Sequence, residues 1–377
     1  MKIGIDIRMI GKKRTGDEAV FFNLVKNLAE IDQKNKYFLY TDRDPEKDQE
    51  LKTEINKLNL TNNFKVIFVK KTNRFCWNFW ALPNYLRKNP VDVFHTQYIA
   101  PFWLPKSIKL VLTIHDISFN FFPEYIKKSD LFFLKTLIPR SIRRADKIIT
   151  VSESEKKNIV DFYKIPPEKV ACAYNGVDFS RFSKKYSPEE IKKINIKYQI
   201  LDTRYILYIG TLQPRKNIPA VIEALKDLDI KLVIAGNRKA RNFDKKIDET
   251  IKKNNLANKA IFPGWIEEED KPALLQMASC FVFPSLYEGF GIPIIEAMAA
   301  ETPVVCSDIP VLREIGQDAA LFCEAKNSRE FAENISKILT DENLRNDLIE
   351  KGKKIAQNFT WQKTAEKTLE IYEKFAK

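Results

Sequence analysis

The chain has 377 residues, of which 44% are hydrophobic, and this size favours two domains that each bury a core. Its net charge is +13, and its apolar runs are too short to span a membrane. Asp6 and Arg8 interrupt the apolar N-terminal segment, which is typical of a first strand and not of a signal peptide. We therefore expect a cytoplasmic protein, with peripheral contact at the inner face of the membrane as an open alternative.

The positive charge is concentrated in the first half of the chain. Residues 1–190 carry 34 Lys and Arg against 23 Asp and Glu, a net +11, which leaves +2 for residues 191–377. A field of this sign attracts a phosphorylated substrate, acidic lipid or nucleic acid. No nucleic-acid-binding motif accompanies it, so we expect no nucleic-acid partner. General enrichment in lysine is the alternative explanation.

The five cysteines show no paired spacing, and two of them lie in apolar runs that are typical of strands. This usage indicates reduced, mostly buried thiols in the cytosol. The two histidines do not lie near a cysteine pair, so a zinc site is not expected. We predict no metal and no cofactor, because the side chains of Arg215 and Lys216 can supply positive charge to a ligand.

Apolar runs alternate with helical stretches along the first half of the chain. The predicted strands are 2–7, 36–41, 65–70, 91–95, 109–114, 146–151 and 169–173, and the predicted helices include 17–31, 127–145 and 153–163.

The second half repeats this alternation, which predicts an α/β protein with two Rossmann-like, doubly wound parallel sheets. The domain changes between Asn175 and Arg204, where Pro188 and polar residues interrupt the strands. The predicted strands are 205–209, 230–235, 280–283 and 303–306, and the helices are 217–228, 241–253, 267–278 and 293–300. A last helix is predicted from an apolar stripe formed by Phe359, Trp361, Ala365, Leu369, Tyr372 and Phe375.

Two loops of the first half follow predicted strands. Gly11 to Gly16 precede a helix that starts near Asp17, the usual place for a phosphate or an acceptor, with a flexible basic turn as the alternative. His115 and Asp116 end the strand 109–114, at the edge where parallel sheets bind ligands. A lone histidine is more often structural, so the residues alone leave its role open.

Arg215 and Lys216 stand between the strand 205–209 and a helix that begins at about Asn217. Cations at a helix N-terminus oppose its dipole. An anion bound between them would remove this conflict, and two solvated charges are the alternative.

Residues 284–296 are expected to form a glycine loop and a helix start, with Pro293 at the first helical position. The N–H groups of Phe290 to Ile294 can take a phosphate. Glu288 and Glu296 would repel that phosphate, so each is expected to contact neutral hydroxyls, which a nucleotide sugar offers on both sides of its diphosphate. The alternatives are a solvated loop charge at Glu288 and, at Glu296, a first-turn glutamate favoured by the helix dipole.

The pattern Glu288-x7-Glu296, with its interleaved glycines, Pro293 and the following Ala-Met-Ala, resembles the signature of the family 4 retaining glycosyltransferases of the GT-B fold. The resemblance covers nearly the whole chain. It implies an acceptor-binding Rossmann-like domain at 1–180, joined by a C-terminal helix at 360–377, and a donor-binding Rossmann-like domain at 181–359.

The resemblance also implies roles in catalysis and donor binding. Glu288 would contact the hydroxyls of the donor sugar, Glu296 the ribose, and His115 the sugar from the first domain. The Gly-x4-Arg-Lys-Asn pattern resembles the diphosphate site, where Arg215 and Lys216 would neutralise the β-phosphate as the sugar leaves. The backbone or loop positions implied near the donor are Gly210, Gly264, Trp265, Gly289, Phe290, Gly291 and Ile292.

Gly11, Gly16 and Asp116 are implied on the acceptor side. The family more often has a denser glycine pair followed by an aromatic residue where this chain has Thr15-Gly16-Asp17-Glu18, which leaves the contacts of the loop open. Aromatic residues also gather in this half, and such rings stack on sugars or, beside basic residues, suit lipid interfaces. Core packing is the alternative for most of them: Trp77, Trp80, Phe102, Trp103, Phe119, Phe121, Phe122 and Tyr125.

The implied function is retaining hexosyl transfer from a nucleoside diphosphate sugar to a glycan or lipid-linked acceptor, in cell-surface polysaccharide or glycolipid biosynthesis. Residues 113–119 with the downstream Phe-Pro-Glu at 122–124 resemble mannosyltransferases of polysaccharide assembly, so GDP-mannose is favoured and a UDP-sugar stays open. The alternatives are a sugar-nucleotide epimerase on the same scaffold and a non-catalytic nucleotide- or glycan-binding protein.

Overall fold

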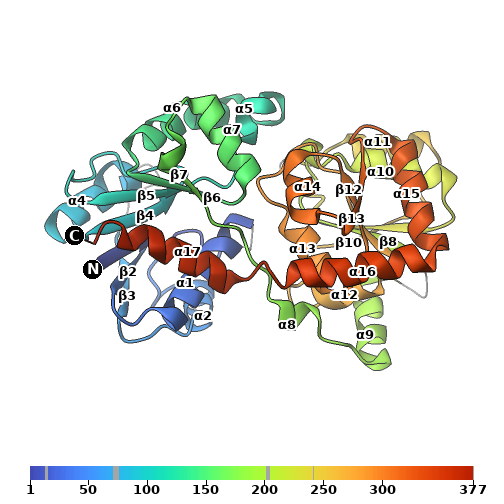
Figure 1. Cartoon of the computed structure of the whole chain (residues 1–377), viewed down its shortest axis with the longest axis horizontal. Coiled ribbons are helices and arrows are strands. Elements are labelled where there is room, and N and C mark those ends of the chain that lie inside the picture. Colours follow the sequence, from blue (N-terminus) through green and yellow to red (C-terminus); the bar gives the residue numbers. More distant parts are fainter. Residues whose placement is uncertain (13–15, 71–75, 201–203, 241, 377) are drawn as a thin grey trace. The chain divides into compact units, whose positions relative to one another are not determined.

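The computed structural model describes residues 1–12, 16–70, 76–200, 204–240 and 242–376. The chain forms two compact units, each around its own sheet (Figure 1). Unit 1 comprises Met1–Phe121, Ile126–Gly176 and Trp361–Lys377, and unit 2 comprises Phe122–Tyr125 and Val177–Thr360. These ranges differ from the predicted domains by a few residues at the junction and by the short segment Phe122–Tyr125.

The sheet of unit 1 has seven parallel strands in the order β3-β2-β1-β4-β5-β6-β7. The order reverses between β1 and β4, and in such sheets ligands bind beyond the carboxyl ends of the two strands at the reversal. The strands are Lys2–Asp6 (β1), Lys36–Thr41 (β2), Phe64–Phe68 (β3), Val93–Gln97 (β4), Lys109–Thr113 (β5), Lys147–Thr150 (β6) and Val170–Cys172 (β7).

Helices lie on both faces of this sheet, because a parallel connection must return across one face (Figure 1). They are Gly16–Ile31 (α1), Gln49–Asn56 (α2), Leu82–Lys88 (α4), Ser118–Phe121 (α5), Lys128–Arg144 (α6) and Glu153–Tyr163 (α7), with short turns at Trp77–Ala81 (η1, a π-helix), Pro123–Tyr125 (η2, grouped with unit 2) and Pro167–Lys169 (η3).

The chain returns to unit 1 at its C-terminus, where helix α17 (Trp361–Glu373) packs along α1 (Figure 1). The predicted apolar stripe is a helix in its central part, where α17 buries Trp361, Ala365 and Tyr372, while Phe359 and Phe375 lie outside this helix. The Tyr372 hydroxyl lies 2.5 Å from His95 Nδ1, and His95 Nε2 lies 2.7 Å from Thr113 Oγ1. This chain of polar contacts ties the last helix to the two central strands β4 and β5.

The sheet of unit 2 has six parallel strands in the order β10-β9-β8-β11-β12-β13. Its order reverses between β8 and β11, so the loops after these two strands border the expected ligand edge. The strands are Tyr205–Ile209 (β8), Lys231–Ala235 (β9), Ala260–Gly264 (β10), Cys280–Phe283 (β11), Val304–Ser307 (β12) and Ala320–Cys323 (β13).

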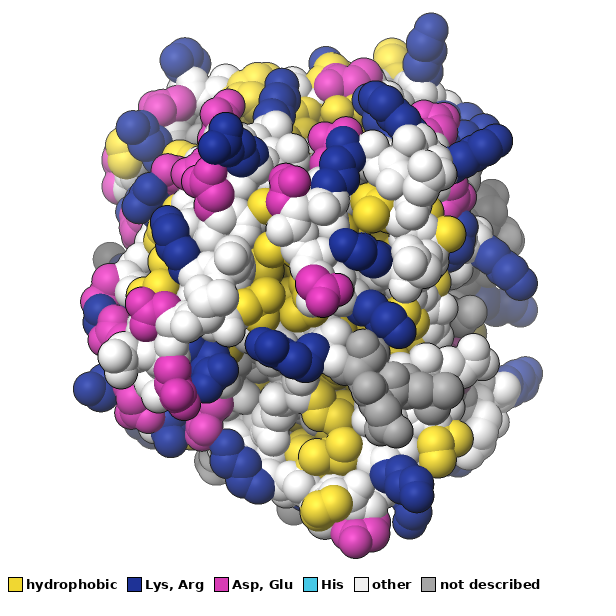
Figure 2. Space-filling view, turned by 90° about the vertical axis from the view of Figure 1, so that its right-hand side faces the viewer, with side chains coloured by type: hydrophobic (Ala, Val, Ile, Leu, Met, Phe, Trp, Pro, Cys, Tyr) yellow, Lys and Arg dark blue, Asp and Glu magenta, His cyan; other side chains and the backbone are white. Residues whose placement is uncertain are grey.

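The face of unit 2 shown in Figure 2 carries positive and negative side chains interspersed, with small apolar areas between them. This mixture agrees with the nearly balanced charge of the second half of the chain.

The helices of unit 2 are Phe179–Phe182 (α8), Pro188–Tyr198 (α9), Ile218–Ala224 (α10), Lys246–Lys253 (α11), Lys271–Met277 (α12), Ile292–Ala299 (α13), Pro310–Gly316 (α14), Ser328–Thr340 (α15) and Glu342–Ala356 (α16), with 3₁₀ turns at Pro214–Lys216 (η4) and Leu225–Asp227 (η5).

The predicted fold class is confirmed, although strand β13 was not predicted and several element bounds differ. Pro219 and Pro272 each occupy the first turn of a helix, where the missing N–H is not needed. The helices predicted at 217–228 and 267–278 therefore begin later, at Ile218 and Lys271, and the first ends in the turn η5. The predicted helix 241–253 begins at Lys246, with residue 241 outside the described residues.

Candidate functional site

The two loops that border the strand reversal of unit 2 are tied to each other by hydrogen bonds. Leu286 N donates to the carbonyl oxygen of Arg215 at 2.9 Å. Asn217, which has a left-handed backbone (φ 54°) and caps α10, donates from Nδ2 to the carbonyl oxygen of Pro284 at 3.0 Å. The loop after β8 and the loop after β11 are therefore held together as one surface at the carboxyl edge of the sheet.

Three charged side chains meet between these loops. Lys216 Nζ lies 2.5 Å from Glu288 Oε1, and Arg215 NH1 lies 3.6 Å from Glu288 Oε2. Arg215 NH1 also donates to the carbonyl oxygen of Tyr287 at 2.5 Å. The side chains of Arg215, Lys216 and Glu288 are only 17%, 12% and 11% exposed, so water screens this cluster weakly. We call these three residues the Arg-Lys-Glu cluster.

The sequence predicted separate partners for these groups, with a ligand anion on the two cations and hydroxyls on Glu288. In this structure Glu288 is the anion that neutralises the cations at the start of α10. The alternatives of solvated charges at Arg215, Lys216 and Glu288 are wrong, because all three side chains are largely buried and paired. The cluster keeps a formal charge of one positive unit, which favours an anion beside it, while Glu288 has lone pairs left for hydroxyl donors.

The glycine loop that follows Glu288 approaches its neighbours closely. Gly291 has a φ of 113°, and a Cβ there would lie 3.1 Å from Leu312 Cδ2. Phe290 is buried and packs edge-on against Phe359, with ring centroids 5.6 Å apart. Helix α13 begins directly after this loop at Ile292. The side chain of Phe290 therefore supports the loop, while the backbone of Gly289 to Ile292 occupies the N-terminal end of the helix.

The sequence predicted that Glu296 lies in the first turn of its helix, and this prediction is wrong. Because α13 begins at Ile292 and Pro293 takes its second position, Glu296 falls in the second turn, where the helix dipole acts less strongly. Its carboxylate pairs with Lys271, whose Nζ lies 3.2 Å from Oε1 and 3.3 Å from Oε2. Each glutamate of the pattern thus has its own cation, and a ligand phosphate need not stand directly between two bare carboxylates.

Gly210 and Gly264 end the strands β8 and β10 at the same edge. Gly210 N donates to the carbonyl oxygen of Ala235, and a Cβ on the neighbouring Gly236 would lie 2.3 Å from the Gly210 oxygen. Gly264 has a φ of 82°, which only glycine adopts without strain. The following Trp265 is 52% exposed, so its ring is available to a ligand.

The candidate residues of unit 1 lie at the carboxyl ends of its own strands. His115 is 6% exposed, and its Nε2 donates to Gln97 Oε1 at 2.8 Å. That contact leaves Nδ1 as the acceptor of the neutral ring. Asp116 Oδ1 accepts hydrogen bonds from the backbone and the hydroxyl of Ser118. Asp116 therefore shapes the loop after β5, while His115 is held by its neighbour on β4.

The loop between Gly11 and Gly16 is described only at its ends, since residues 13–15 lie outside the described residues. Gly11 has a φ of 77°, and its N–H donates to Glu18 Oε1 at 2.6 Å. Gly16 is the first residue of α1, and a Cβ built on it meets no atom within 4 Å. Glu18, which is 2% exposed, thus fixes one end of the loop.

Two parts of the chain match known glycosyltransferase families. Residues 190–355 match the family of glycosyl transferases group 1, and residues 15–181 match glycosyltransferase family 4. The O-antigen chain mannosyltransferase B of Escherichia coli is 31% identical over 306 residues, which are 78% of this chain and 76% of that protein. The chain belongs to the family 4, group 1 glycosyltransferases. It is therefore an enzyme of the hexosyltransferase class.

Two further similarities place this glycosyltransferase among related proteins. The O-antigen chain mannosyltransferase RfbU of Salmonella typhimurium is 27% identical over 285 residues, 74% of each protein. The Anabaena protein HepE, solved in complex with UDP-glucose, superimposes with a TM-score of 0.75 at 19% identity and covers 99% of this chain and 100% of that one. The second similarity shows the shared fold.

In the part of the glycosyltransferase that the structure describes, no three His, Cys, Asp or Glu side chains are grouped so that they could hold a metal ion. No helix among the same residues combines the length and the apolar character needed to cross a membrane. All five cysteines are free thiols, and Cys280, Cys306 and Cys323 are buried.

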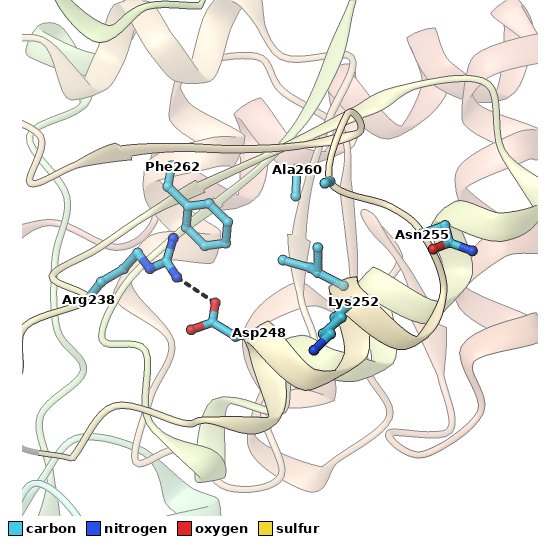
Figure 3. Close-up of a pocket in the computed structure, with 8 residues that line it drawn as sticks. Arg238, Asp248, Lys252, Asn255, Ala260 and Phe262 are labelled. Carbon is cyan, nitrogen blue, oxygen red and sulfur yellow. Dashed lines mark hydrogen bonds and ion pairs between the residues drawn. The ribbon is translucent and has the colours of Figure 1, made fainter.

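A separate pocket of about 490 Å³ lies between α11 and the edge strand β10 (Figure 3). The Arg238 guanidinium stands 4.3 Å from the centroid of the Phe262 ring and pairs with Asp248 at 2.5 Å. Figure 3 shows Arg238 and Asp248 turned toward each other beside Phe262. This pocket shares no residue with the Arg-Lys-Glu cluster and borders an edge strand, whereas ligands of parallel sheets bind at the strand reversal, so the site is assigned to the two loops there.

Sequence reasoning missed the partners that hold the predicted residues in place. Lys271, Asn217 and Gln97 contact Glu296, the loop after β11 and His115, respectively. One signal was available for Lys271, because a lysine at the first position of a helix opposes the dipole and needs an anion. In a chain this rich in lysine, that signal did not stand out.

Proposed function

We propose that this glycosyltransferase is a retaining mannosyltransferase that uses GDP-mannose, with a UDP-sugar as the second donor candidate. The observation that carries the proposal is the Arg-Lys-Glu cluster at the strand reversal of unit 2. It combines a surplus positive charge with a carboxylate that has acceptor capacity left. A nucleoside diphosphate sugar offers the complementary groups, a diphosphate and sugar hydroxyls.

In this proposal Arg215 and Lys216 stabilise the negative charge that develops on the β-phosphate as the sugar leaves. Both cations are largely buried, so their attraction to that charge is screened less than in water. The N-terminal end of α13 adds further N–H donors at the same edge. Glu288, held by the two cations, orients the sugar through its hydroxyls.

The geometry of Glu288 supports retention without a covalent glycosyl-enzyme intermediate. Each of its carboxylate oxygens is paired, Oε1 with Lys216 and Oε2 with Arg215. Pairing with cations lowers the nucleophilicity of a carboxylate, which argues against attack by Glu288 on the sugar. A front-face transfer, in which the departing phosphate takes the proton of the acceptor hydroxyl, needs no such nucleophile.

The relatives support mannose and a glycan or lipid-linked acceptor of polysaccharide assembly. Two of them are named O-antigen chain mannosyltransferases. Membership of a transferase family favours transfer over the epimerase and non-catalytic alternatives.

The proposal is tested by incubating purified enzyme with GDP-mannose, with other GDP-sugars and with UDP-sugars. Each donor is supplied with and without a mannosylated or lipid-diphosphate-linked acceptor. We expect nucleotide release that depends on acceptor and is fastest with GDP-mannose. Proton NMR of the product should show the α configuration of the donor retained. A β product contradicts retention, and conversion of the donor sugar without an acceptor supports the epimerase.

We further propose that unit 1 contacts acidic lipid with an aromatic and basic surface that contains Trp80, Phe102, Trp103 and Arg140. Trp80 and Trp103 are 61% and 56% exposed. The Phe102 ring stacks on Phe79 and lies 4.0 Å from the Arg140 guanidinium. Exposed indole rings beside cations suit the headgroup region of an anionic membrane, and the first half of the chain carries the surplus charge.

Cosedimentation with phosphatidylglycerol vesicles and with phosphatidylcholine vesicles tests this contact. The wild-type enzyme should bind the anionic vesicles preferentially, and Trp80→Ser with Trp103→Ser should reduce binding by about tenfold. Phe162→Ser, an exposed aromatic residue on α7, serves as the matched control. Equal binding by the double variant and the wild type would refute this surface.

A further inference from the structure

Lys271 occupies an unfavourable position that is compensated by acidic neighbours. It is the first residue of α12, where its charge opposes the helix dipole, and its side chain is only 13% exposed. Its Nζ contacts both carboxylate oxygens of Glu296, at 3.2 and 3.3 Å, and Glu268 Oε1 at 3.1 Å. The three N–H donors of the ammonium group therefore have acceptors on two carboxylates.

The contacts continue beyond Lys271 to a second cation. Arg181 NH2 lies 3.3 Å from Glu268 Oε2 and also donates to the main-chain oxygen of Glu268. The charges thus alternate in the order Arg181, Glu268, Lys271, Glu296. Burial opposes the charge of Lys271, but Glu296 and Glu268 outweigh it and raise the pKa of Lys271. The ammonium group therefore stays charged at neutral pH.

The number of lone pairs on Glu296 decides what it can still bind. An ionised carboxylate has about four acceptor positions, two on each oxygen. Lys271 takes one position on each oxygen, which leaves one on each for another donor. Two neighbouring hydroxyls, such as the 2′- and 3′-hydroxyls of a ribose, match this remaining pair of acceptors.

We propose that Lys271 is a positioning residue that favours the ionised form of Glu296 and aims its carboxylate so that both oxygens accept hydrogen bonds from the ribose diol of the donor. This inference rests on the proposed function, which places a nucleotide at the carboxyl edge of unit 2. The role belongs to Lys271 in this chain and goes beyond the expected contact of Glu296 with ribose.

Removal of Lys271 has a defined electrostatic consequence. The pKa of Glu296 lies above its ordinary value, because burial outweighs the opposing charges of Lys271 and Arg181, and Glu268 adds to the rise. Without Lys271 the pKa of the Glu296 carboxyl therefore rises further. A protonated Glu296 carries a donor hydrogen in place of one acceptor position and no longer matches two hydroxyl donors. Recognition of the diol should then weaken, and it should recover as the pH rises.

The test compares the dissociation constants of GDP and 2′,3′-dideoxy-GDP, and of the corresponding uridine nucleotides, between pH 6 and 9. For the nucleotide of the preferred base, we expect the wild type to favour the ribose form by at least about tenfold at pH 9, because the diol hydrogen-bonds to a charged carboxylate, and to keep more of this preference at pH 6 than Lys271→Met does. Lys271→Met should bind both forms equally at pH 6 and regain part of the preference at pH 9. Lys271→Arg should restore the wild-type behaviour.

Lys197→Met is the matched control, because Lys197 pairs with the neighbouring Asp270 at 2.6 Å on the surface of the same unit. It should leave the preference unchanged. Lys271→Gln replaces Lys271→Met should the latter fail to fold. A wild type that binds none of the four nucleotides overturns the proposed function itself. A wild type that prefers the ribose form, together with a Lys271 variant that keeps this preference at every pH, overturns only the role of Lys271.

Discussion

Lys216 lies between a carboxylate and an aromatic ring. Its Nζ is 2.5 Å from Glu288 Oε1 and 5.4 Å from the centroid of Phe283. The ring excludes water from one side of the ammonium group, while the carboxylate compensates its charge. A cation held in this way needs little reorganisation when a phosphate approaches, which is the condition for strong electrostatic stabilisation of a leaving group.

The substitution Glu288→Gln separates the two proposed functions of the Arg-Lys-Glu cluster, which are binding of the diphosphate and orientation of the sugar. The amide has the same shape but no charge, so the formal charge of the cluster rises from +1 to +2. We expect GDP to bind as tightly as to the wild type or more tightly, while kcat falls by about a hundredfold, because an amide orients the sugar hydroxyls less well than a charged acceptor. Calorimetry with GDP and steady-state kinetics measure the two effects.

The opposite pattern, weaker GDP binding with an unchanged kcat, would show that Glu288 is a structural loop charge. Thermal unfolding provides the control for this variant, since its melting temperature should change far less than its turnover.

At the scale of the elements, close packing of strand ends fixes the position of the site loops. Gly236 follows β9, and a Cβ there would lie 2.3 Å from the backbone oxygen of Gly210 and within 2.9 Å of two side-chain atoms of Leu212. Both neighbours belong to the loop that leads to Arg215. The backbone oxygen cannot move without shifting that loop.

Gly236→Ala should therefore destabilise unit 2 by about 3 kcal/mol, as forced overpacking does, and should reduce donor affinity at the same time. Gly16→Ala is the control for stability, because a Cβ at Gly16 meets nothing within 4 Å. Urea unfolding compares the two variants. Equal free energies of unfolding for both would contradict the close approach.

The packing of helix α17 onto the sheet of unit 1 involves the buried side chain of His95, which contacts the Tyr372 hydroxyl. Burial lowers the pKa of His95 to about 3, with a smaller contribution from His115, and Asp6 partly opposes the shift. The unfolded chain takes up a proton at His95 near pH 6.5, but the folded protein does not take it up until about pH 3. Stability from the neutral ring is therefore complete above pH 6.5 and decreases as the pH falls below that value.

Between pH 7.5 and 5.5 this one group should cost the wild type about 1.4 kcal/mol of unfolding free energy. His95→Asn should lack this dependence, although it is less stable overall because the Tyr372 hydroxyl loses its partner. Denaturant titrations at both pH values compare the slopes. A variant with the same pH dependence as the wild type would show that His95 takes up its proton at the same pH in the folded and the unfolded protein, which contradicts a lowered pKa.

At the scale of the whole molecule, the alternation of apolar runs and helical stretches was enough to predict two parallel sheets. Short runs such as 36–41, 205–209 and 280–283 coincide with β2, β8 and β11. Strand β13 (Ala320–Cys323) was not predicted, because polar and charged residues flank this short apolar run on both sides. Periodicity reports local burial, so it identifies elements better than it locates their ends.

The site was predictable only in part, for the same reason. Motif residues such as Glu288 and Lys216 could be named from the chain, but their direct pairing joins positions 72 residues apart. The pairing of Lys271 with Glu296 crosses from one helix to the next, and the short pattern around Glu296 contains no sign of it. Partners of this kind depend on the order of strands in the sheet, which local sequence does not specify.

The central claim, that the Arg-Lys-Glu cluster binds the diphosphate of the donor, is tested most directly by calorimetric titration of GDP and GDP-mannose into the wild type, Lys216→Met and Arg329→Gln. Arg329 is an 85% exposed cation on α15 and controls for net charge. We predict that Lys216→Met weakens both ligands by about 10- to 100-fold, because it removes a charge-assisted contact to phosphate, and that Arg329→Gln binds like the wild type. Binding to Lys216→Met within twofold of the wild type would contradict the claim.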